Sequence, residues 1–178
     1  MALLLKERDR AIASDNWSAA SATLIENVIG SDFDDQIRGD DRANSLTGRK
    51  DADTLEGGLG DDTILDGEGA DRLIGGGGAD RFLYLSAAEG GDTIADFEPG
   101  TDKLLLLGAA FGGLSAGTLS TAAYFTGTEA TASDQRVGYN ADTGEVLFDA
   151  DGVGGAKALA IATLSSAPAL SNTDITIL

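Results

Sequence analysis

Apolar residues recur at every ninth position between Gly30 and Leu83. Written as six lines of nine residues, this stretch has no insertions, and position eight is always apolar: Ile37, Leu46, Leu55, Ile64, Leu73 and Phe82. Position one is Gly in five lines, and position six is Asp in five lines and Asn in the other. A period of nine fits neither a helix of about 3.6 residues per turn nor plain strand alternation. It predicts a repeat in which each line makes one turn and one short strand.

The glycines suit the turn, because Gly reaches backbone angles that are closed to other residues. Positions seven to nine can form a strand of roughly 10 Å, and only position eight needs to face inward. Two lines then complete one coil, with a strand on each side, so alternate lines stack in two sheets. Val28 lies nine residues before Ile37, and it extends the apolar column into a strand expected over 24–29.

The same coil stacks the residues at position six into two columns, with about 4.8 Å between coils. One column holds Asp35, Asp53 and Asp71, and the other holds Asn44, Asp62 and Asp80. Stacked like charges oppose folding, and a hard dication between them reverses that effect. Ca²⁺ accepts carboxylate and backbone carbonyl oxygens, and the chain has no Cys or His for softer metals. A disordered Gly/Asp-rich linker is the alternative, but it does not require an apolar column in register.

The repeat resembles the RTX, or hemolysin-type, calcium-binding nonapeptide G-G-x-G-x-D-x-U-x. The resemblance implies an all-β protein with a right-handed parallel β-roll over 30–83. An N-terminal cap over 1–29 precedes the roll, and an antiparallel β cap over 84–178 follows it. In that family each Ca²⁺ lies between lines n and n+2. It takes carbonyls two and four and the Asp of the earlier line, with carbonyls one and three and the Asp of the later line.

Carried onto this chain, the family pattern implies several Ca²⁺ ions. The best site joins lines four and six through Gly58, Gly60, Asp62, Gly75, Gly77 and Asp80. A second joins lines three and five through Arg49, Asp51, Asp53, Asp66, Glu68 and Asp71. A third pairs Asp35 with Asp53, and a fourth pairs Asn44 with Asp62. The same turns add as backbone candidates Gly48, Lys50, Gly57, Leu59, Gly67, Gly69, Gly76 and Gly78, and the segment beyond the repeat adds Asp92 and Asp102.

The first three lines depart from the family pattern. Position four is Gly only in the last three lines, and the first three carry Phe33, Arg42 and Asp51. Line three also places Arg49 and Lys50 in a turn that should bind a cation. We therefore expect the early half of the roll to bind Ca²⁺ weakly or not at all.

After Phe82 the nine-residue register stops. Residues 92–97 (DTIADF), followed by an apolar strand over 102–107, are similar to the usual exit from an RTX roll; a hairpin with solvated carboxylates is the alternative. A Gly/Ala-rich stretch over 108–117 predicts a loop with a short helix. Strands are expected over 123–126, 136–140, 146–149, 158–164 and 174–178, arranged as a meander. The acidic stretch over 149–152 is interpreted as a turn, because no Glu follows at the spacing of an EF-hand.

Composition limits the possible functions. A net charge of −18 argues against nucleic acid and anionic membranes as partners, and no apolar run has the length of a membrane span. The zinc-protease motif H-E-x-x-H is impossible without His. Only 29 residues precede the repeat, so we expect no enzyme activity.

The resemblance implies a module of a secreted bacterial protein, without an N-terminal signal peptide, that folds on binding Ca²⁺ outside the cell. The ending Asp174-Ile-Thr-Ile-Leu178 is similar to those of RTX proteins exported by type I secretion, so the type I machinery is an expected partner. Two alternatives stay open. One is a module that binds extracellular polysaccharide or a surface, like the repeat modules of alginate epimerases. The other is the non-catalytic tail of a secreted enzyme.

Overall fold

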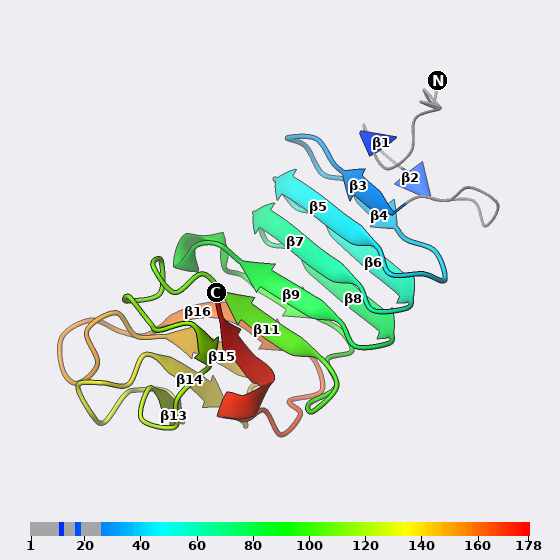
Figure 1. The fold of residues 1–178 in the computed structure, drawn as a ribbon. Helices are drawn as coiled ribbons and strands as arrows, with labels where there is room; N and C mark the ends of the chain where they lie inside the picture. Colours follow the sequence, from blue (N-terminus) through cyan, green and yellow to red (C-terminus); the bar gives the residue numbers. More distant parts are fainter. Residues whose placement is uncertain (1–10, 13–16, 19–25) are drawn as a thin grey trace.

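The computed structural model describes residues 11–12, 17–18 and 26–178. The strands in this part of the chain form two facing sheets (Figure 1). The first sheet contains β3 (Asn27–Ile29), β5 (Ser45–Lys50), β7 (Thr63–Glu68), β9 (Arg81–Tyr84) and β11 (Lys103–Leu106). The second contains β4 (Gln36–Arg38), β6 (Thr54–Leu59), β8 (Arg72–Gly77) and β10 (Asp92–Ile94). Successive strands alternate between the sheets, so two of them complete one coil.

The register of the parallel strands confirms the predicted coil. Within each sheet Asn27 pairs with Ser45, Ser45 with Thr63, Gln36 with Thr54, and Thr54 with Arg72. Each of these pairs is 18 residues apart, which is two nine-residue lines. The chain is thus an all-β protein built on a parallel β-roll.

A single apolar column fills the roll. Position eight faces inward in all six lines, as predicted, and these side chains are at most 2% exposed: Ile37, Leu46, Leu55, Ile64, Leu73 and Phe82. Val28 continues the column at one end, and Ile94 and Leu104 continue it at the other. The column is only one residue wide on each sheet, so hydrophobic burial inside the roll is limited.

The roll continues past the end of the sequence repeat. β10 pairs in parallel with β8 and β11 pairs in parallel with β9, which makes a further coil. The pairs Arg72–Thr93 and Arg81–Lys103 are 21 and 22 residues apart instead of 18. The alternative of a hairpin over 92–107 is therefore wrong, because Ile94 and Leu104 both face inward and β10 and β11 lie in opposite sheets.

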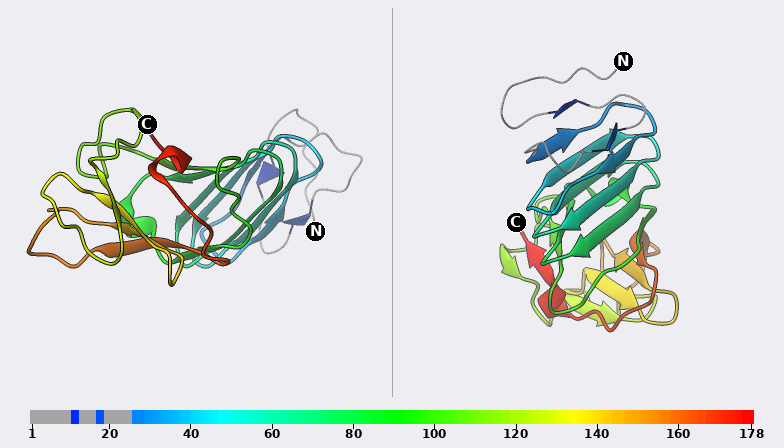
Figure 2. Two further views of the ribbon diagram at one scale, coloured as in Figure 1. Left: turned by 90° about the horizontal axis from the view of Figure 1, so that it is seen from below. Right: turned by 90° about the vertical axis from the view of Figure 1, so that its right-hand side faces the viewer.

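The C-terminal region packs on the open end of this coil (Figures 1 and 2). It contains β12 (Gly117–Thr118), β13 (Tyr124–Thr126), β14 (Val137–Asn140), β15 (Glu145–Phe148), β16 (Leu159–Leu164) and β17 (Ile175–Ile177), with the short 3₁₀ helices η1 (Ala87–Glu89) and η2 (Asn172–Asp174). β14, β15 and β16 are antiparallel, as expected for a meander. A wider core, including an edge-to-face contact between Phe111 and Phe148, holds this region together.

Three expectations for this region were wrong. β13 pairs in parallel with β14, so the strands are not a simple meander. Residues 108–117 form turns and not a helix. β17, expected as the last strand of the meander, lies between β11 and β12 in the other sheet. The expected turn over 149–152 is present, and the Asp149 carboxylate accepts the N–H groups of Asp151 and Gly152.

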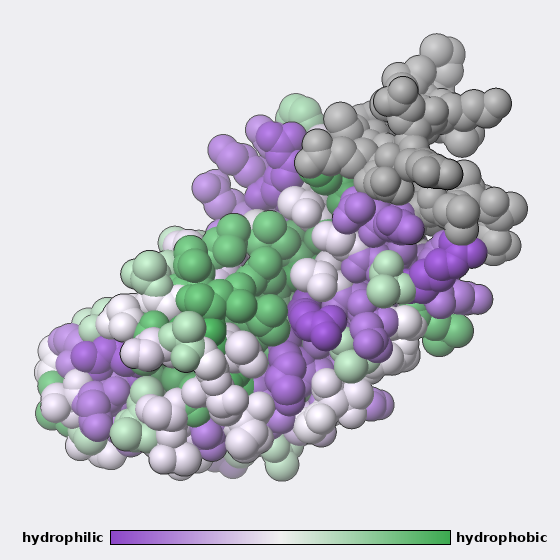
Figure 3. Space-filling view, viewed as in Figure 1, coloured by the Kyte–Doolittle hydropathy of each residue, from purple (hydrophilic) through white to green (hydrophobic). Residues whose placement is uncertain are grey.

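At the other end, β1 (Ala11–Ile12) and β2 (Trp17–Ser18) extend the two sheets by pairing with β3 and β4. The expectations for residues 1–10, and for the side chain of Trp17 as a cap, lie outside the described residues. Within the described residues, no helix has the length and apolar character needed to cross a membrane. Figure 3 shows apolar residues gathered over β9 and β11, where Leu83 and Leu105 face outward and are partly exposed.

Candidate metal sites

Two columns of carboxylates follow the edges of the roll. Each member lies just before a strand or, for Asp92, at its first residue, and the backbone N–H of every member except the last donates to Oδ1 of the member one coil further on. On one edge these bonds are 2.7 to 3.0 Å long and link Asp35, Asp53, Asp71 and Asp92. On the other they are 2.7 to 3.0 Å long and link Asn44, Asp62, Asp80 and Asp102. Asp92 and Asp102 thus extend one column each, and the residue that follows Asp80 is Asp102.

Four of these carboxylates have a second oxygen that is buried and unpaired in the described part of the chain. Oδ2 of Asp53, Asp62, Asp71 and Asp92 has no hydrogen-bond partner among the described residues, although these side chains are at most 3% exposed. A buried charged oxygen without a hydrogen-bond partner reduces the stability of the folded state by several kcal/mol. Such oxygens are suited to binding a cation.

Backbone carbonyls converge on the same oxygens. A methyl group on Gly57 would overlap both Asp62 Oδ2 and the carbonyl oxygen of Gly75. A methyl group on Gly48 would overlap Asp53 Oδ2 and the carbonyl oxygen of Asp66. Beside each of these two glycines, a carboxylate oxygen of one line therefore lies close to the backbone carbonyl of position one in the line after next. These are two of the ligands that the family pattern assigns to a single Ca²⁺.

The other candidate carbonyls differ in what they face and in whether they already accept a hydrogen bond. Those of Gly58 and Gly60 point at the next turn of the same edge, where a methyl group on Gly76 or Gly78 would overlap them. The carbonyl of Gly77 accepts the N–H of Gly60 at 2.7 Å, so it already has one partner. Within lines four and six the structure thus brings Asp62 and the carbonyl of Gly75 together, and it places the carbonyls of Gly58 and Gly60 against the turn of line six.

The turn of line three adopts the conformation of the glycine turns without glycine. Arg49 and Asp51 have φ of 106° and 65°, close to 116° and 99° at the equivalent Gly58 and Gly60. Residues 31, 33, 40 and 42, which fill the same positions in lines one and two, do not have positive φ. The first two turns therefore have a different backbone shape from the later ones, and weak binding in the early half stays a prediction.

This strain leads to a prediction. Replacing Arg49 and Asp51 together with Gly should stabilise the Ca²⁺-bound chain by about 1–2 kcal/mol per residue, the cost of a left-handed conformation. The lost ion pair between Arg49 and Asp32 is half-exposed, so it contributes little. Thermal unfolding at saturating Ca²⁺ measures the gain. As a matched control, Arg42→Gly should bring no gain, and an equal gain there would contradict the argument.

Burial changes the proton affinity of the column. Burial, together with the charge of the neighbouring carboxylate (Asp71 for Asp53, Asp80 for Asp62), raises the pKa of Asp53 and of Asp62 to about 7. Asp174 is a useful contrast. Burial acts to raise its pKa, but hydrogen bonds from Ser171 and Gly100, and the ammonium of Lys103 at 3.6 Å, hold it below the ordinary value. The buried Asp174 is satisfied by its own chain, whereas the column carboxylates are not.

These shifts predict how stability depends on pH in the absence of Ca²⁺. A raised pKa means that folding favours the protonated acid. The metal-free chain should therefore be most stable below the ordinary carboxyl pKa of about 4. It should lose stability as the pH rises through about 7, the value for Asp53 and Asp62. Thermal unfolding of dialysed, metal-free protein across this range is the measurement. A melting temperature that rises with pH would contradict the prediction.

One feature of the site was not expected from the sequence. The family pattern uses only the backbone carbonyl of Asp66, but the structure brings its carboxylate to Asp71 and Asp92. Asp96, to which the sequence assigned no ligand role, accepts the N–H groups of Gly75 and Gly76, both at 2.9 Å. The sequence signal for Asp66 was its departure from Gly at position one.

Known proteins resemble this chain both in the sequence repeat and in the fold. Residues 29–64 and 56–94 match the family of RTX calcium-binding nonapeptide repeats. No curated protein gives a match in sequence. The solution structure of the AlgE6R3 subunit from the Azotobacter vinelandii mannuronan C5-epimerase is similar, with 27% identity and a TM-score of 0.54. The similarity covers 83% of this chain and 80% of that one.

Proposed function

We propose that this chain, an RTX-type protein whose residues 29–94 are calcium-binding nonapeptide repeats, is a calcium-folded module of a secreted protein. The main support is the set of buried, unpartnered carboxylate oxygens that meet backbone carbonyls between neighbouring coils. Oxygen donors of both kinds are the ligands that Ca²⁺ prefers. Bound Ca²⁺ supplies the positive charge that this arrangement lacks.

The placement of the carboxylates and of the apolar residues explains why the chain would fold only when Ca²⁺ is bound. Without a cation, the two columns repel and leave buried oxygens unpaired, and the single apolar column offers little to offset them. At ten times the dissociation constant, one bound ion stabilises the fold by about 1.4 kcal/mol. Sites with dissociation constants of about 10⁻⁴ to 10⁻³ M are empty in cytosol and filled outside the cell. We infer that the chain leaves the cell unfolded and folds at its destination.

The position of the C-terminal strand supports export before folding. Ile175 and Ile177 are at most 2% exposed, and β17 lies between two other strands. A secretion machinery that recognises residues 174–178 could reach them only in the unfolded chain. We propose that the type I machinery is that partner.

Limited proteolysis tests the proposal. At millimolar Ca²⁺ the region 29–94 should resist a protease of broad specificity, and in chelator it should be cut many times. Equal amounts of Mg²⁺ should give no protection, because Mg²⁺ requires near-ideal octahedral geometry and keeps its waters. Equal resistance in chelator and in Ca²⁺ would overturn the proposal.

We propose no catalytic role for the module. The chain contains no His, and the carboxylates of the two columns are engaged in backbone hydrogen bonds. Any catalysis would belong to another part of a longer parent protein.

A polysaccharide-binding module is the second candidate, favoured by the similarity to a subunit of a mannuronan epimerase. Four of the six basic residues of the repeat are paired with acidic side chains: Arg38, Arg42, Arg49 and Lys50. The other two, Arg72 and Arg81, lie on opposite sheets. These placements favour the first proposal, because they do not form one basic groove. Co-sedimentation with alginate at millimolar Ca²⁺ distinguishes the two candidates. If alginate retains the chain, and Arg72→Gln or Arg81→Gln reduces that retention, the polysaccharide-binding module would be established.

A further inference from the structure

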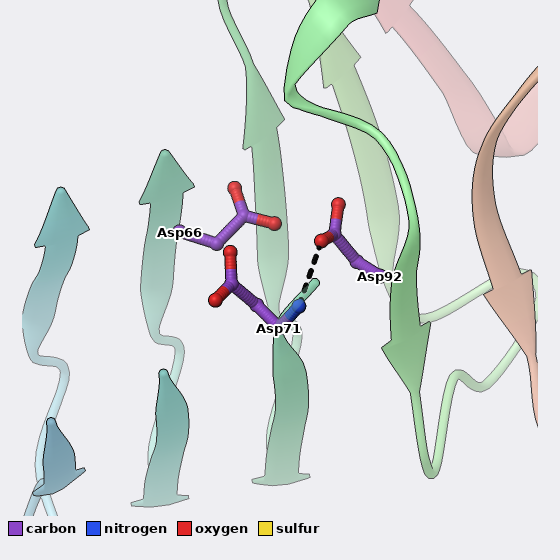
Figure 4. Close-up of side chains that lie close together, drawn as sticks. All are labelled: Asp66, Asp71 and Asp92. Carbon is purple, nitrogen blue, oxygen red and sulfur yellow. Dashed lines mark hydrogen bonds between the residues drawn. The ribbon is translucent and has the colours of Figure 1, made fainter. Parts of the chain in front are cut away.

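Three carboxylates meet at the end of the roll, next to the C-terminal strands. They belong to Asp66 on β7, Asp71 just before β8, and Asp92 at the start of β10 (Figure 4). One oxygen of each lies within 4.8 Å of the others. The three side chains are 1%, 3% and 1% exposed, so water does not screen their charges.

Asp66 replaces the glycine of the repeat at the most crowded point of the turn. In the other lines a methyl group at position one would overlap the carboxylate of its own line, as at Gly48 and Gly57. In line five a whole carboxylate stands there. Asp66 Oδ1 accepts the N–H of Gly67 at 2.9 Å, and Oδ2 has no partner among the described residues.

The neighbouring groups do not satisfy Asp66. Oδ2 of Asp71 and Oδ2 of Asp92 also lack partners in the described part of the chain. The hydroxyl of Tyr84 is fully buried, has no described partner either, and lies close enough to feel the charges of Asp66 and Asp92. Four buried oxygen groups, three of them acidic, thus lie close together, and within the described part of the chain none of the three carboxylates has an ion pair. Unpaired, such charges would strongly oppose folding.

The fold also explains why this place differs from the other coils. Asp92 is the column residue of the next coil, but the turn before it is replaced by η1 (Ala87–Glu89). A 3₁₀ helix does not present its carbonyls as a glycine turn does. The side chain of Asp66 stands where it can replace those missing backbone ligands.

We propose that Asp66, Asp71 and Asp92, with the hydroxyl of Tyr84, form a terminal Ca²⁺ site based on side chains, a proposal that rests on the calcium-folded function above. Three carboxylates give it more negative charge than any space between the regular coils, where two position-six residues meet. Because ligand charge raises Ca²⁺ affinity, this site fills first. Asp92 lies on β10, which pairs with both β8 and β16. The ion therefore joins the roll to the C-terminal strands.

Terbium luminescence tests the terminal site in the full chain. Tb³⁺ replaces Ca²⁺ at oxygen sites and emits when a nearby Tyr absorbs light. The first ions added should give an emission that Tyr84→Phe removes, and that Ca²⁺ reverses by competition. Asp66→Asn should weaken this first phase by about tenfold or more, the effect expected for one charged ligand. It should also lower the number of bound Ca²⁺ by one in native mass spectrometry.

Two further variants keep the test decisive. Asp134→Asn removes an exposed carboxylate far from the cluster and should change nothing. Asp66→Gly restores the glycine of the repeat, so it folds even if Asp66→Asn does not, and it too should bind one ion fewer. An unchanged ion count and unchanged first phase in both Asp66 variants, in a chain that still folds on Ca²⁺, would overturn the terminal site alone. Asp66 and Asp92 would then share a proton. A wild-type chain that binds neither Tb³⁺ nor Ca²⁺ would overturn the proposed function with it.

Discussion

Asp62→Asn should have opposite effects with and without Ca²⁺. Asn retains an oxygen that can accept the N–H of Asn44, which Asp62 now accepts at 2.7 Å. It removes the charge from Oδ2, the buried oxygen that meets the carbonyl of Gly75. In chelator the variant should be more stable than the wild type, because one buried charge is gone. In Ca²⁺ it should require about tenfold more metal to fold, because one charged ligand is gone.

The neighbouring residue supplies the control. Asp61 is exposed, and its Oδ1 accepts the N–H of Ala79 at 2.9 Å. Asp61→Asn removes the same charge one position away and preserves that hydrogen bond, so it should shift neither midpoint appreciably. A titration with a stabilising osmolyte in chelator, which favours the folded state, and a Ca²⁺ titration, both followed by circular dichroism, give the two midpoints. If Asp62→Asn destabilised the chain equally in both conditions, Asp62 would have a packing role and no role in binding metal.

Gly76→Val should prevent the roll from forming at any practical Ca²⁺ concentration. Gly76 has φ of 96°, which costs an L-residue about 1–2 kcal/mol and a β-branched residue more. A side chain there would also overlap the backbone carbonyl of Gly58, which cannot move without opening the turn of the preceding coil. The variant should therefore lose the cooperative transition, measured by circular dichroism at saturating Ca²⁺.

Gly100 separates the two causes. It has φ of 87°, but nothing lies within 4 Å of the position that its side chain would take. Gly100→Val should therefore carry the conformational cost alone and still fold with a reduced melting temperature. Equal losses in the two variants would mean that backbone conformation accounts for the effect, and that the close stacking of successive turns does not.

The sequence predicts the coil well because its period is a direct consequence of the geometry. Each strand needs one inward residue, and each turn of the last four lines has a residue such as Gly58 with positive φ, so both recur every nine positions. The pairing of Asp62 with the carbonyl of Gly75 follows from the same register. Contacts that recur from coil to coil therefore recur in the sequence with the same nine-residue period.

The parts that the sequence does not predict are those where the register ends. β10 and β11 continue the roll with pairs 21 and 22 residues apart, because η1 and the turn at Pro99–Gly100 lengthen the connections. A nine-residue pattern cannot reveal such a coil. Asp66 stood out only as a missing glycine, and its approach to Asp92 depends on that irregular coil. The parallel pairing of β13 with β14 likewise depends on tertiary packing, which leaves no periodic signal.

A Ca²⁺ titration of the chelated full chain, followed by far-ultraviolet circular dichroism with Mg²⁺ as the control, tests the central claim most directly. Calcium-coupled folding predicts little β-signal in chelator, a cooperative gain at about 10⁻⁴ to 10⁻³ M Ca²⁺, and no gain with Mg²⁺. A spectrum that is fully folded in chelator and unchanged by Ca²⁺ would contradict it. The apolar column and the C-terminal strands would then suffice to fold the chain without metal.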